Sequence, residues 1–339
     1  MKEMYNVSAS PHVRSGATTA RIMTDVAIAL IPASLFGIYQ FGFRAFLVLL
    51  ASITAAMLSE YVWKRFVIKK AGGAYECSAL VTGLLIGMNL PASVPLWIPI
   101  VGSVFAIIVV KEMFGGLGSN FMNPALAARC FLLICFAGRM TDFAVEKAAR
   151  SHFMYGAASV DGLSSATPLA VIKNLEAGAD ITKAVSLKDM FFGFTGGVIG
   201  ETSVLAILIG AAYLLIRKVI SFRIPVAYIA TFAVFILLFG GRGYDLTFLA
   251  CELCGGGLML GAWFMATDYV TSPITKTGQI VFGILCGIMT GIIRVVSNSA
   301  EGVSYSIIFC NLLVPIIEKL TMPRAFGLPR RVKKGGASK

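Results

Sequence analysis

Apolar residues gather in ten runs along the chain, separated by polar stretches. Five runs cover residues 22–39, 45–63, 79–90, 96–110 and 125–137, and five more cover 191–216, 224–239, 247–265, 280–296 and 303–317. A helix needs about 20 mostly apolar residues to cross a bilayer, and the longer runs reach that length. The pattern therefore predicts an all-α polytopic membrane protein with about ten transmembrane helices.

Two runs at matching places in the two sets of five are short or interrupted. The run 79–90 spans only about 18 Å as a helix, at about 1.5 Å per residue, and ends before Pro91. The run 247–265 is interrupted by Gly255, Gly256 and Gly257. Broken helices at corresponding positions are typical of membrane proteins built from internal repeats, with a site near the middle of the bilayer. Because five helices per set is an odd number, the two repeats are expected to be inverted.

This pattern divides the chain into five parts. They are an N-terminal segment (1–21), a first five-helix repeat (22–138), a long loop (139–190), a second five-helix repeat (191–320) and a basic tail (321–339).

Composition and charge agree with a membrane protein. The chain is 57% hydrophobic and 14% charged, which excludes an ordinary soluble globule. The net charge of +12 could suggest a nucleic-acid partner, but most basic residues lie in short loops and in the tail. Positive charge in short loops marks the cytoplasmic side, so we expect both termini in the cytoplasm and the loop 139–190 outside it. We therefore expect the protein to lie in a lipid bilayer and to have no nucleic-acid partner.

The cysteines offer little chemistry. All seven lie in or beside apolar runs, and Cys251 and Cys254 form a C-x-x-C pair that could be read as a redox pair or half of a metal site. No second pair or histidine accompanies them at a suitable spacing, so small buried thiols are the favoured interpretation. We expect no metal site.

Acids and amides inside the membrane are costly and are therefore candidates for an ion path. Those in or beside the apolar runs include Glu76, Asn89, Asn120, Asn123, Glu201, Glu252 and Asp268. Each of the acids could instead form a structural ion pair, for which Arg129 and Arg294 are available, or simply lie at an interface. The glycine-rich stretch 115–125 could direct backbone groups at an ion, or could simply be a tight turn that needs glycine.

Two tracts of small residues end in threonine. One is Ser-Gly-Ala-Thr-Thr, which contains Thr18, and the other is Ser-Ser-Ala-Thr-Pro-Leu, which contains Thr167. A hydroxyl that receives a phosphate-bearing cofactor needs an exposed loop and small neighbours, and both tracts are expected to meet this condition. Asp161 lies six residues before Thr167, whereas the same place before Thr18 is occupied by His12.

The stretch from Asp161 to Thr167 resembles the flavinylation motif of the RnfD/NqrB membrane subunits, Asp-x-x-Ser-[Gly/Ser]-Ala-Thr. The similarity continues in order along most of the chain, in the stretches 10–12, 115–125, 200–203, 264–268 and 272–273. Ser165 stands where glycine is more usual, and Tyr269 where proline is frequent. The length of the chain is closer to the D subunit of the Rnf complex than to the B subunit of the sodium-pumping NADH:quinone reductase.

This resemblance implies a covalent cofactor. In the family, a flavin transferase takes the FMN moiety of FAD and joins its phosphate to the last threonine of the motif. By resemblance that residue is Thr167, with Asp161, Ser164, Ser165 and Ala166 completing the motif. No catalytic side chain is expected here, and the flavin supplies the electron chemistry.

The resemblance also implies a setting. It points to a subunit of an electron-driven sodium or proton pump in the bacterial inner membrane, which couples reduced ferredoxin to NAD. The ferredoxin and NAD sites would belong to partner Rnf subunits, since this chain has neither an iron–sulfur cysteine cluster nor a nucleotide fold. The alternative is a non-redox channel or secondary transporter for a small polar solute, which would be colourless.

Overall fold

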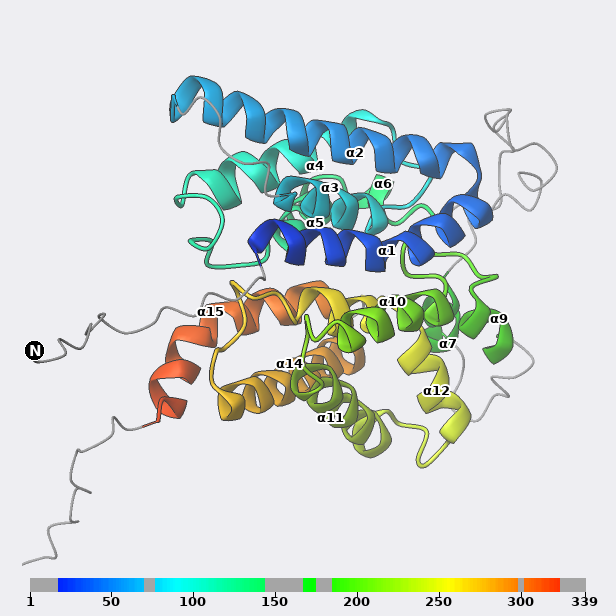
Figure 1. Cartoon of the computed structure of the whole chain (residues 1–339). Coiled ribbons are helices and arrows are strands. Elements are labelled where there is room, and N and C mark those ends of the chain that lie inside the picture. Colours follow the sequence, from blue (N-terminus) through cyan, green and yellow to red (C-terminus); the bar gives the residue numbers. More distant parts are fainter. Residues whose placement is uncertain (1–17, 70–76, 144–166, 175–184, 298–301, 324–339) are drawn as a thin grey trace, which may run out of the picture.

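The computed structural model describes residues 18–69, 77–143, 167–174, 185–297 and 302–323. Every regular element in these ranges is a helix (Figure 1). The first half contains α1 (Thr19–Phe41), α2 (Phe43–Val62) with η1 (Trp63–Val67), α3 (Ser78–Met88), α4 (Trp97–Val104) with η2 (Phe105–Glu112), α5 (Pro124–Cys135) and α6 (Ala137–Met140). The second contains α7 (Pro168–Asn174), α9 (Leu187–Phe192), α10 (Val204–Ile216), α11 (Arg223–Phe239), α12 (Leu246–Cys254), α13 (Leu258–Leu260) with η4 (Gly261–Met265), α14 (Lys276–Val296) and α15 (Val303–Thr321).

Each predicted apolar run contains a helix, and the prediction of an all-helical membrane protein is confirmed. Among the described residues, α1, α2 with η1, α14 and α15 are individually long and apolar enough to cross a membrane. A fifth span results if α12 and the helix Leu258–Met265 are counted together, although they are bent by 62° at the glycines between them. The interruption expected at these glycines is therefore present, and α3 ends at Met88, as the short third run predicted.

The prediction for the sixth run is wrong at its beginning. It placed the start of the span at residue 191, but α10 begins at Val204, where the Ser203 hydroxyl accepts a hydrogen bond from the Ala206 amide. Residues 193–203 are non-helical and run back into the protein. The amide of Ile199 donates to the Leu90 carbonyl (3.1 Å) and that of Gly200 to the Met88 carbonyl (2.8 Å). An apolar run with several glycines forms a buried loop here because the end of α3 satisfies its backbone.

The two halves of the chain meet through α1 with α10 and through α5 with α15. The contact between α1 and α10 is close, since a Cβ built on Gly210 would lie 2.0 Å from the Ala29 carbonyl oxygen. The first helices of the two predicted repeats, α1 and α10, thus contact each other, and so do their last helices, α5 and α15. The inverted relation of the two repeats stays a prediction.

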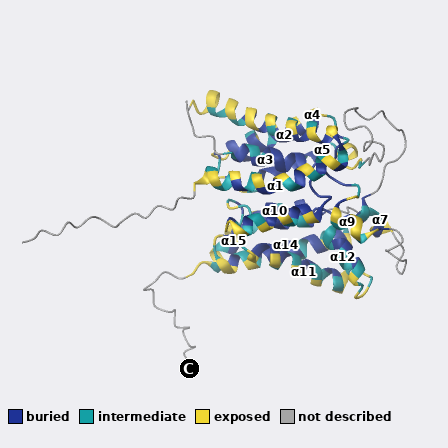
Figure 2. Ribbon diagram, turned by 45° about the vertical axis from the view of Figure 1, so that its right-hand side comes forward, coloured by how far each residue is buried: buried dark blue, intermediate teal, exposed yellow. Residues whose placement is uncertain are grey.

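The bundle has two distinct ends. The start of α1 and the end of α15 lie at one end, and α7 and α9 lie at the other (Figures 1 and 2). We refer to these as the terminal end and the α7 end. Large apolar side chains are exposed along the outside of the helices, which is expected for a surface that faces lipid. The side of the membrane that each end faces stays a prediction.

Candidate functional site

Three interruptions of the helical structure meet inside the protein. They are the end of α3 at Asn89, the buried loop 193–203 and the break between α12 and α13 at Gly255–Gly257. The loop contacts the end of α3 through the two backbone hydrogen bonds described above. A Cβ on Gly257 would lie 3.3 Å from Oε2 of Glu201, which belongs to the same loop. The three interruptions therefore lie together, and we call them the centre of broken helices. Interrupted helices that meet inside a membrane protein are typical of a polar site within the bilayer.

Arg129 of α5 connects two of these interruptions. Its Nη1 donates to Oδ1 of Asn89 at 2.6 Å, and Nδ2 of Asn89 donates to the Leu85 carbonyl at 2.6 Å. Nη1 of Arg129 also lies 3.8 Å from the Cβ position of Gly257, beside Glu201. A guanidinium and a carboxylate are therefore both buried at the α12–α13 break. Gly257 has φ of 67°, so this position favours glycine for its backbone as well as for the limited space.

Glu252 and Arg294 form a separate buried ion pair, with Nη1 and Oε2 2.9 Å apart. The Arg294 guanidinium also donates to the carbonyls of Glu252 (2.6 Å), Gly255 (2.9 Å) and Gly256 (3.3 Å). It therefore binds the backbone acceptors that α12 leaves at its C-terminus. This arrangement favours the structural ion pair over an ion ligand at Glu252, because its carboxylate already contacts a full positive charge.

Thr167 lies at the N-terminus of α7, at the α7 end of the bundle. Its Oγ1 accepts a hydrogen bond from the Ala170 amide (3.3 Å), and its carbonyl accepts one from the Val171 amide (3.0 Å). The expectation that Thr167 is exposed on a loop is wrong for this structure, since the residue is only 8% exposed. Helix α7 docks through the buried side chains of Leu169 and Ile172, and this docking covers the threonine.

A narrow pocket with about 300 Å³ of empty space lies beside Thr167. Its wall combines α7 with the buried loop and the α12–α13 break, and it includes Thr195, Gly196, Gly197, Glu201, Thr202, Gly255 and Gly256. A Cβ on Gly197 would reach within 3.6 Å of the Thr202 methyl group and so would fill part of this space. Glu201 belongs both to this pocket and to the centre of broken helices. The motif residues Asp161, Ser164, Ser165 and Ala166 lie outside the described residues.

Lys173 fixes the other end of α7. Its ammonium group donates to the carbonyls of Arg294 (3.0 Å) and Ser297, at the C-terminus of α14. Burial lowers the pKa of Lys173, the nearby Glu252 carboxylate raises it, and Arg294 lowers it. The helix that carries Thr167 is therefore attached to the C-terminus of α14.

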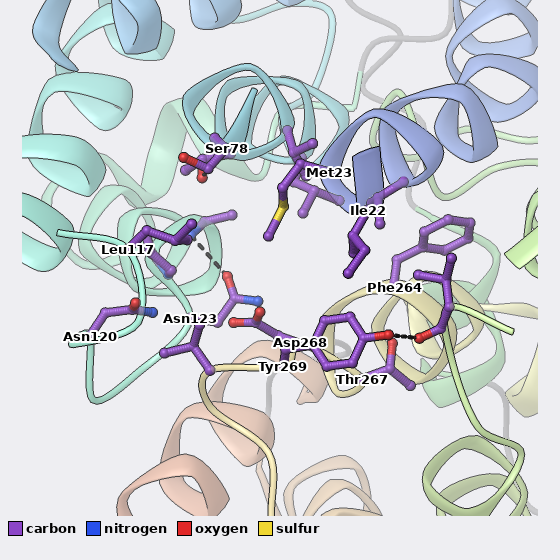
Figure 3. Close-up of a pocket in the computed structure, with 18 of the residues that line it drawn as sticks. Ile22, Met23, Ser78, Leu117, Asn120, Asn123, Phe264, Thr267, Asp268 and Tyr269 are labelled. Atoms are coloured by element: carbon purple, nitrogen blue, oxygen red, sulfur yellow. Dashed lines mark hydrogen bonds between the residues drawn. The ribbon is translucent and has the colours of Figure 1, made fainter. Parts of the chain in front are cut away.

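A second cavity, with about 780 Å³ of empty space, lies at the terminal end between the two halves (Figure 3). The predicted residues Asn120, Asn123 and Asp268 line it, and Figure 3 shows Asn123 and Asp268 close together although they come from different halves. The Thr271 hydroxyl donates to Oδ2 of Asp268 at 3.1 Å. Burial raises the pKa of the Asp268 carboxyl, although hydrogen bonds from Thr271 and two backbone amides lower it.

Lys111, a basic residue that directly follows the fourth apolar run, also lines this cavity. The side chain is 2% exposed. Its Nζ donates to Oγ of Ser78 (2.7 Å) and Oε1 of Glu60 (3.2 Å), and it lies 3.9 Å from Oε1 of Glu112. The Lys-Glu dipeptide that ends the fourth apolar run was the available signal, since two charges that continue an apolar helix need partners.

The structure thus distributes the predicted ion-path residues over three places. Asn120, Asn123 and Asp268 share the terminal cavity, Asn89 and Glu201 share the centre with Arg129, and Glu252 pairs with Arg294. Met265 lies between the first two places, since its carbonyl accepts from Asn123 (3.4 Å) and its sulfur lies 4.0 Å from Nδ2 of Asn89. Glu76 lies outside the described residues. Within the described ranges, no group of three His, Cys, Asp or Glu side chains could hold a metal ion.

Comparison with known proteins identifies the family. The model of the NQR2, RnfD, RnfE family matches residues 6–327. The D subunit of the sodium-translocating ferredoxin:NAD⁺ oxidoreductase complex of Acetobacterium woodii is 43% identical over 98% of both chains. The proton-translocating counterpart of Clostridium ljungdahlii is 37% identical over 97% of this chain and 98% of the relative, and the D subunit of an ion-translocating oxidoreductase complex of Escherichia coli is 31% identical over 96% and 99%. This chain belongs to the NQR2, RnfD, RnfE family.

Proposed function

We propose that this protein is the D subunit of an ion-translocating ferredoxin:NAD⁺ oxidoreductase complex in the bacterial inner membrane, and that it carries FMN covalently on Thr167. The relatives' names support the assignment to the complex. The observation that carries the flavin proposal is the position of Thr167 within the Asp161–Thr167 motif, at a pocket whose wall contains several glycines. The partners would be the other subunits of the complex and a flavin transferase.

The residues around Thr167 fit a phosphoester. Thr195 and Thr202 line the pocket and offer hydroxyl groups, and the glycines leave room where other residues would place a Cβ. When attached, the flavin supplies the electron transfer, and the chain fixes its phosphate end. During attachment the Thr167 oxygen bonds to the FMN phosphorus of FAD and AMP leaves.

Burial of Thr167 has a consequence for the attachment. A transferase cannot approach a hydroxyl that is 8% exposed and covered by its own helix. Attachment therefore precedes the docking of α7, or α7 undocks for the reaction. The contacts that must form afterwards are those of Leu169, Ile172 and Lys173.

Mass spectrometry of protein taken from its natural membrane tests the flavin proposal. The peptide 160–173 is expected to carry the added mass of FMN, with fragment ions that place it on Thr167. Recovery of this peptide at its unmodified mass alone would contradict the proposal, and FMN on the peptide that contains Thr18 would assign it to the other tract.

We further propose that ions cross through the centre of broken helices. The terminal cavity, Met265, Asn89 with Arg129, and Glu201 form a polar series that leads to the pocket of Thr167. Arg129 would repel a passing cation unless a carboxylate balances its charge. Glu201, buried beside the same Gly257, is in position to do so.

Replacing Glu201 by glutamine is expected to lower ion uptake that is coupled to ferredoxin:NAD activity by at least about tenfold in inverted vesicles. Two unit charges 4 Å apart interact by about 4 kcal/mol at an effective dielectric constant of about 20, and about 1.4 kcal/mol changes a rate tenfold. The covalent flavin should remain. Asp189→Asn, which removes an exposed acid of α9, serves as the control and should pump normally. Normal pumping by Glu201→Gln would exclude this path, and the sodium dependence of the activity distinguishes sodium from protons.

A further inference from the structure

The hydroxyl group of Thr202 is buried and makes no hydrogen bond. The residue is 5% exposed, and its Oγ1 has no hydrogen-bond partner among the described residues. Other buried hydroxyls, those of Ser34, Ser59 and Thr290, donate to the carbonyl four residues earlier in their own helices. Thr202 lies in the non-helical loop 193–203, where this arrangement is absent. A buried hydroxyl without a partner lowers stability, so its presence calls for an explanation.

Thr202 lies in the wall of the narrow pocket beside Thr167, on a loop whose position is fixed by backbone hydrogen bonds to the end of α3. The methyl group of Thr202 lies 3.6 Å from the Cβ position of Gly197. Rotation of the side chain about its Cα–Cβ bond exchanges the places of the methyl and the hydroxyl, so the hydroxyl can be directed at a group in this pocket. Ser52 carries the other buried hydroxyl without a partner in the described ranges, and it lines neither this pocket nor the terminal cavity.

The charge of this pocket determines which donors a phosphate would find in it. The described residues that line it include no lysine or arginine, and their one charged side chain is that of Glu201. A phosphate that joins FMN to a threonine is a diester and keeps one negative charge. It therefore needs neutral donors here, which are hydroxyl groups and backbone amides, and a hydrogen bond from a neutral donor to a charged oxygen is stronger than one between neutral groups.

We propose that the Thr202 hydroxyl donates a hydrogen bond to the phosphate on Thr167 and thereby holds α7 against the loop 193–203. This inference rests on the proposed attachment of FMN at Thr167, and it adds the residue that receives the phosphate. Thr195 lines the same pocket but is only half-buried, so its hydroxyl does not need a partner inside the protein. The contact explains why a hydroxyl without a partner is retained at Thr202, and it makes α7 dock more firmly once the flavin is attached.

Hydrogen exchange of the full-length protein from its natural membrane, followed by mass spectrometry, tests this inference on a peptide that contains Thr167 and α7. The forms of this peptide with and without FMN differ in mass, so the amides of α7 can be followed separately in each. A hydrogen bond to a charged acceptor changes an equilibrium by a factor of about ten or more, so Thr202→Val should speed the exchange of α7 at least about tenfold in the form with FMN. The form without FMN, and Thr167→Ala protein, should exchange equally fast with valine or threonine at position 202. Thr202→Ser keeps the hydroxyl and should exchange like the wild type.

The matched control is Thr54→Val, which makes the same substitution at an exposed position of α2. The Thr54 hydroxyl donates to the carbonyls of Leu50 and Ala51 in its own helix, so its loss should leave the exchange of α7 unchanged in both forms.

The possible results separate this inference from the attachment on which it rests. Equal exchange of the FMN-carrying wild type and Thr202→Val would overturn the inference and leave the attachment at Thr167 intact. Complete absence of FMN from Thr202→Val would also overturn it, because the hydroxyl would then act during attachment, before α7 docks. Absence of FMN from this peptide in the wild type would contradict the proposed function itself, and the inference would fall with it.

Discussion

Thr167→Ala protein is expected to carry no covalent flavin, whereas the wild type should fluoresce under ultraviolet light on a denaturing gel. Alanine lacks the oxygen that forms the phosphoester, so the loss should be complete. Thr167→Ser retains a hydroxyl at the same place and should keep part or all of the fluorescence. Thr18→Ala should fluoresce like the wild type, because its tract lacks the acid that Asp161 provides to Thr167.

The structure allows a loss of attachment to be separated from a loss of folding. Oγ1 of Thr167 also caps α7 by accepting from the Ala170 amide. Removing such a cap costs about 1 kcal/mol, which is a small part of the free energy of unfolding. Thr167→Ala should therefore reach the membrane and assemble in normal amounts. A Thr167→Ala protein that still fluoresces after denaturation would contradict the assignment.

The sequence predicted the helical architecture well because membrane helices follow from local composition. Runs of about 20 apolar residues have few alternatives in lipid, and Pro91 and the three consecutive glycines 255–257 disfavour the continuation of a helix. The interruptions of α3 and α12–α13 could therefore be located without any knowledge of their surroundings.

The errors concern segments whose structure is decided by distant residues. The loop 193–203 belongs to the apolar run 191–216 although it is rich in glycine, and its hydrogen bonds to Met88 and Leu90 make a non-helical backbone acceptable inside the protein. Burial of Thr167 likewise depends on Lys173 reaching the end of α14, more than 100 residues away. No local pattern contains such information.

The candidate site was predicted as a set of residues but not as an arrangement. Asn89, Glu201 and Arg129 were recognised as buried polar residues, yet their meeting at Gly257 required the fold. The same applies to Glu252, which the sequence grouped with the ion-path residues and which the structure pairs with Arg294. An acidic residue in an apolar run is a candidate for ion transport. Whether it instead forms a structural ion pair depends on the cation that lies nearest to it in the fold.

Arg294→Met is expected to lower the stability of the protein strongly, because it leaves the Glu252 carboxylate buried without its partner. Breaking one side of a buried ion pair costs about 3 to 5 kcal/mol. The carbonyls of Gly255 and Gly256 also lose a donor, so the break between α12 and α13 should loosen. Thermal unfolding of the detergent-solubilised protein, followed by intrinsic fluorescence, measures the effect.

The second variant, Glu252→Gln with Arg294→Met, tests whether the unpaired charge is the cause. It removes both charges, so it should recover a large part of the loss, and what remains reports the backbone contacts of Arg294. Arg223→Met is the control, since Arg223 is an exposed cation at the start of α11 and its loss should change the free energy of unfolding by no more than about 0.5 kcal/mol. If Arg294→Met unfolded at the same temperature as Arg223→Met, the pair would contribute little to the structure, and Glu252 would return to the group of ion-path candidates. Because Arg294 is at once the partner of Glu252 and the donor to the end of α12, we expect the opposite result.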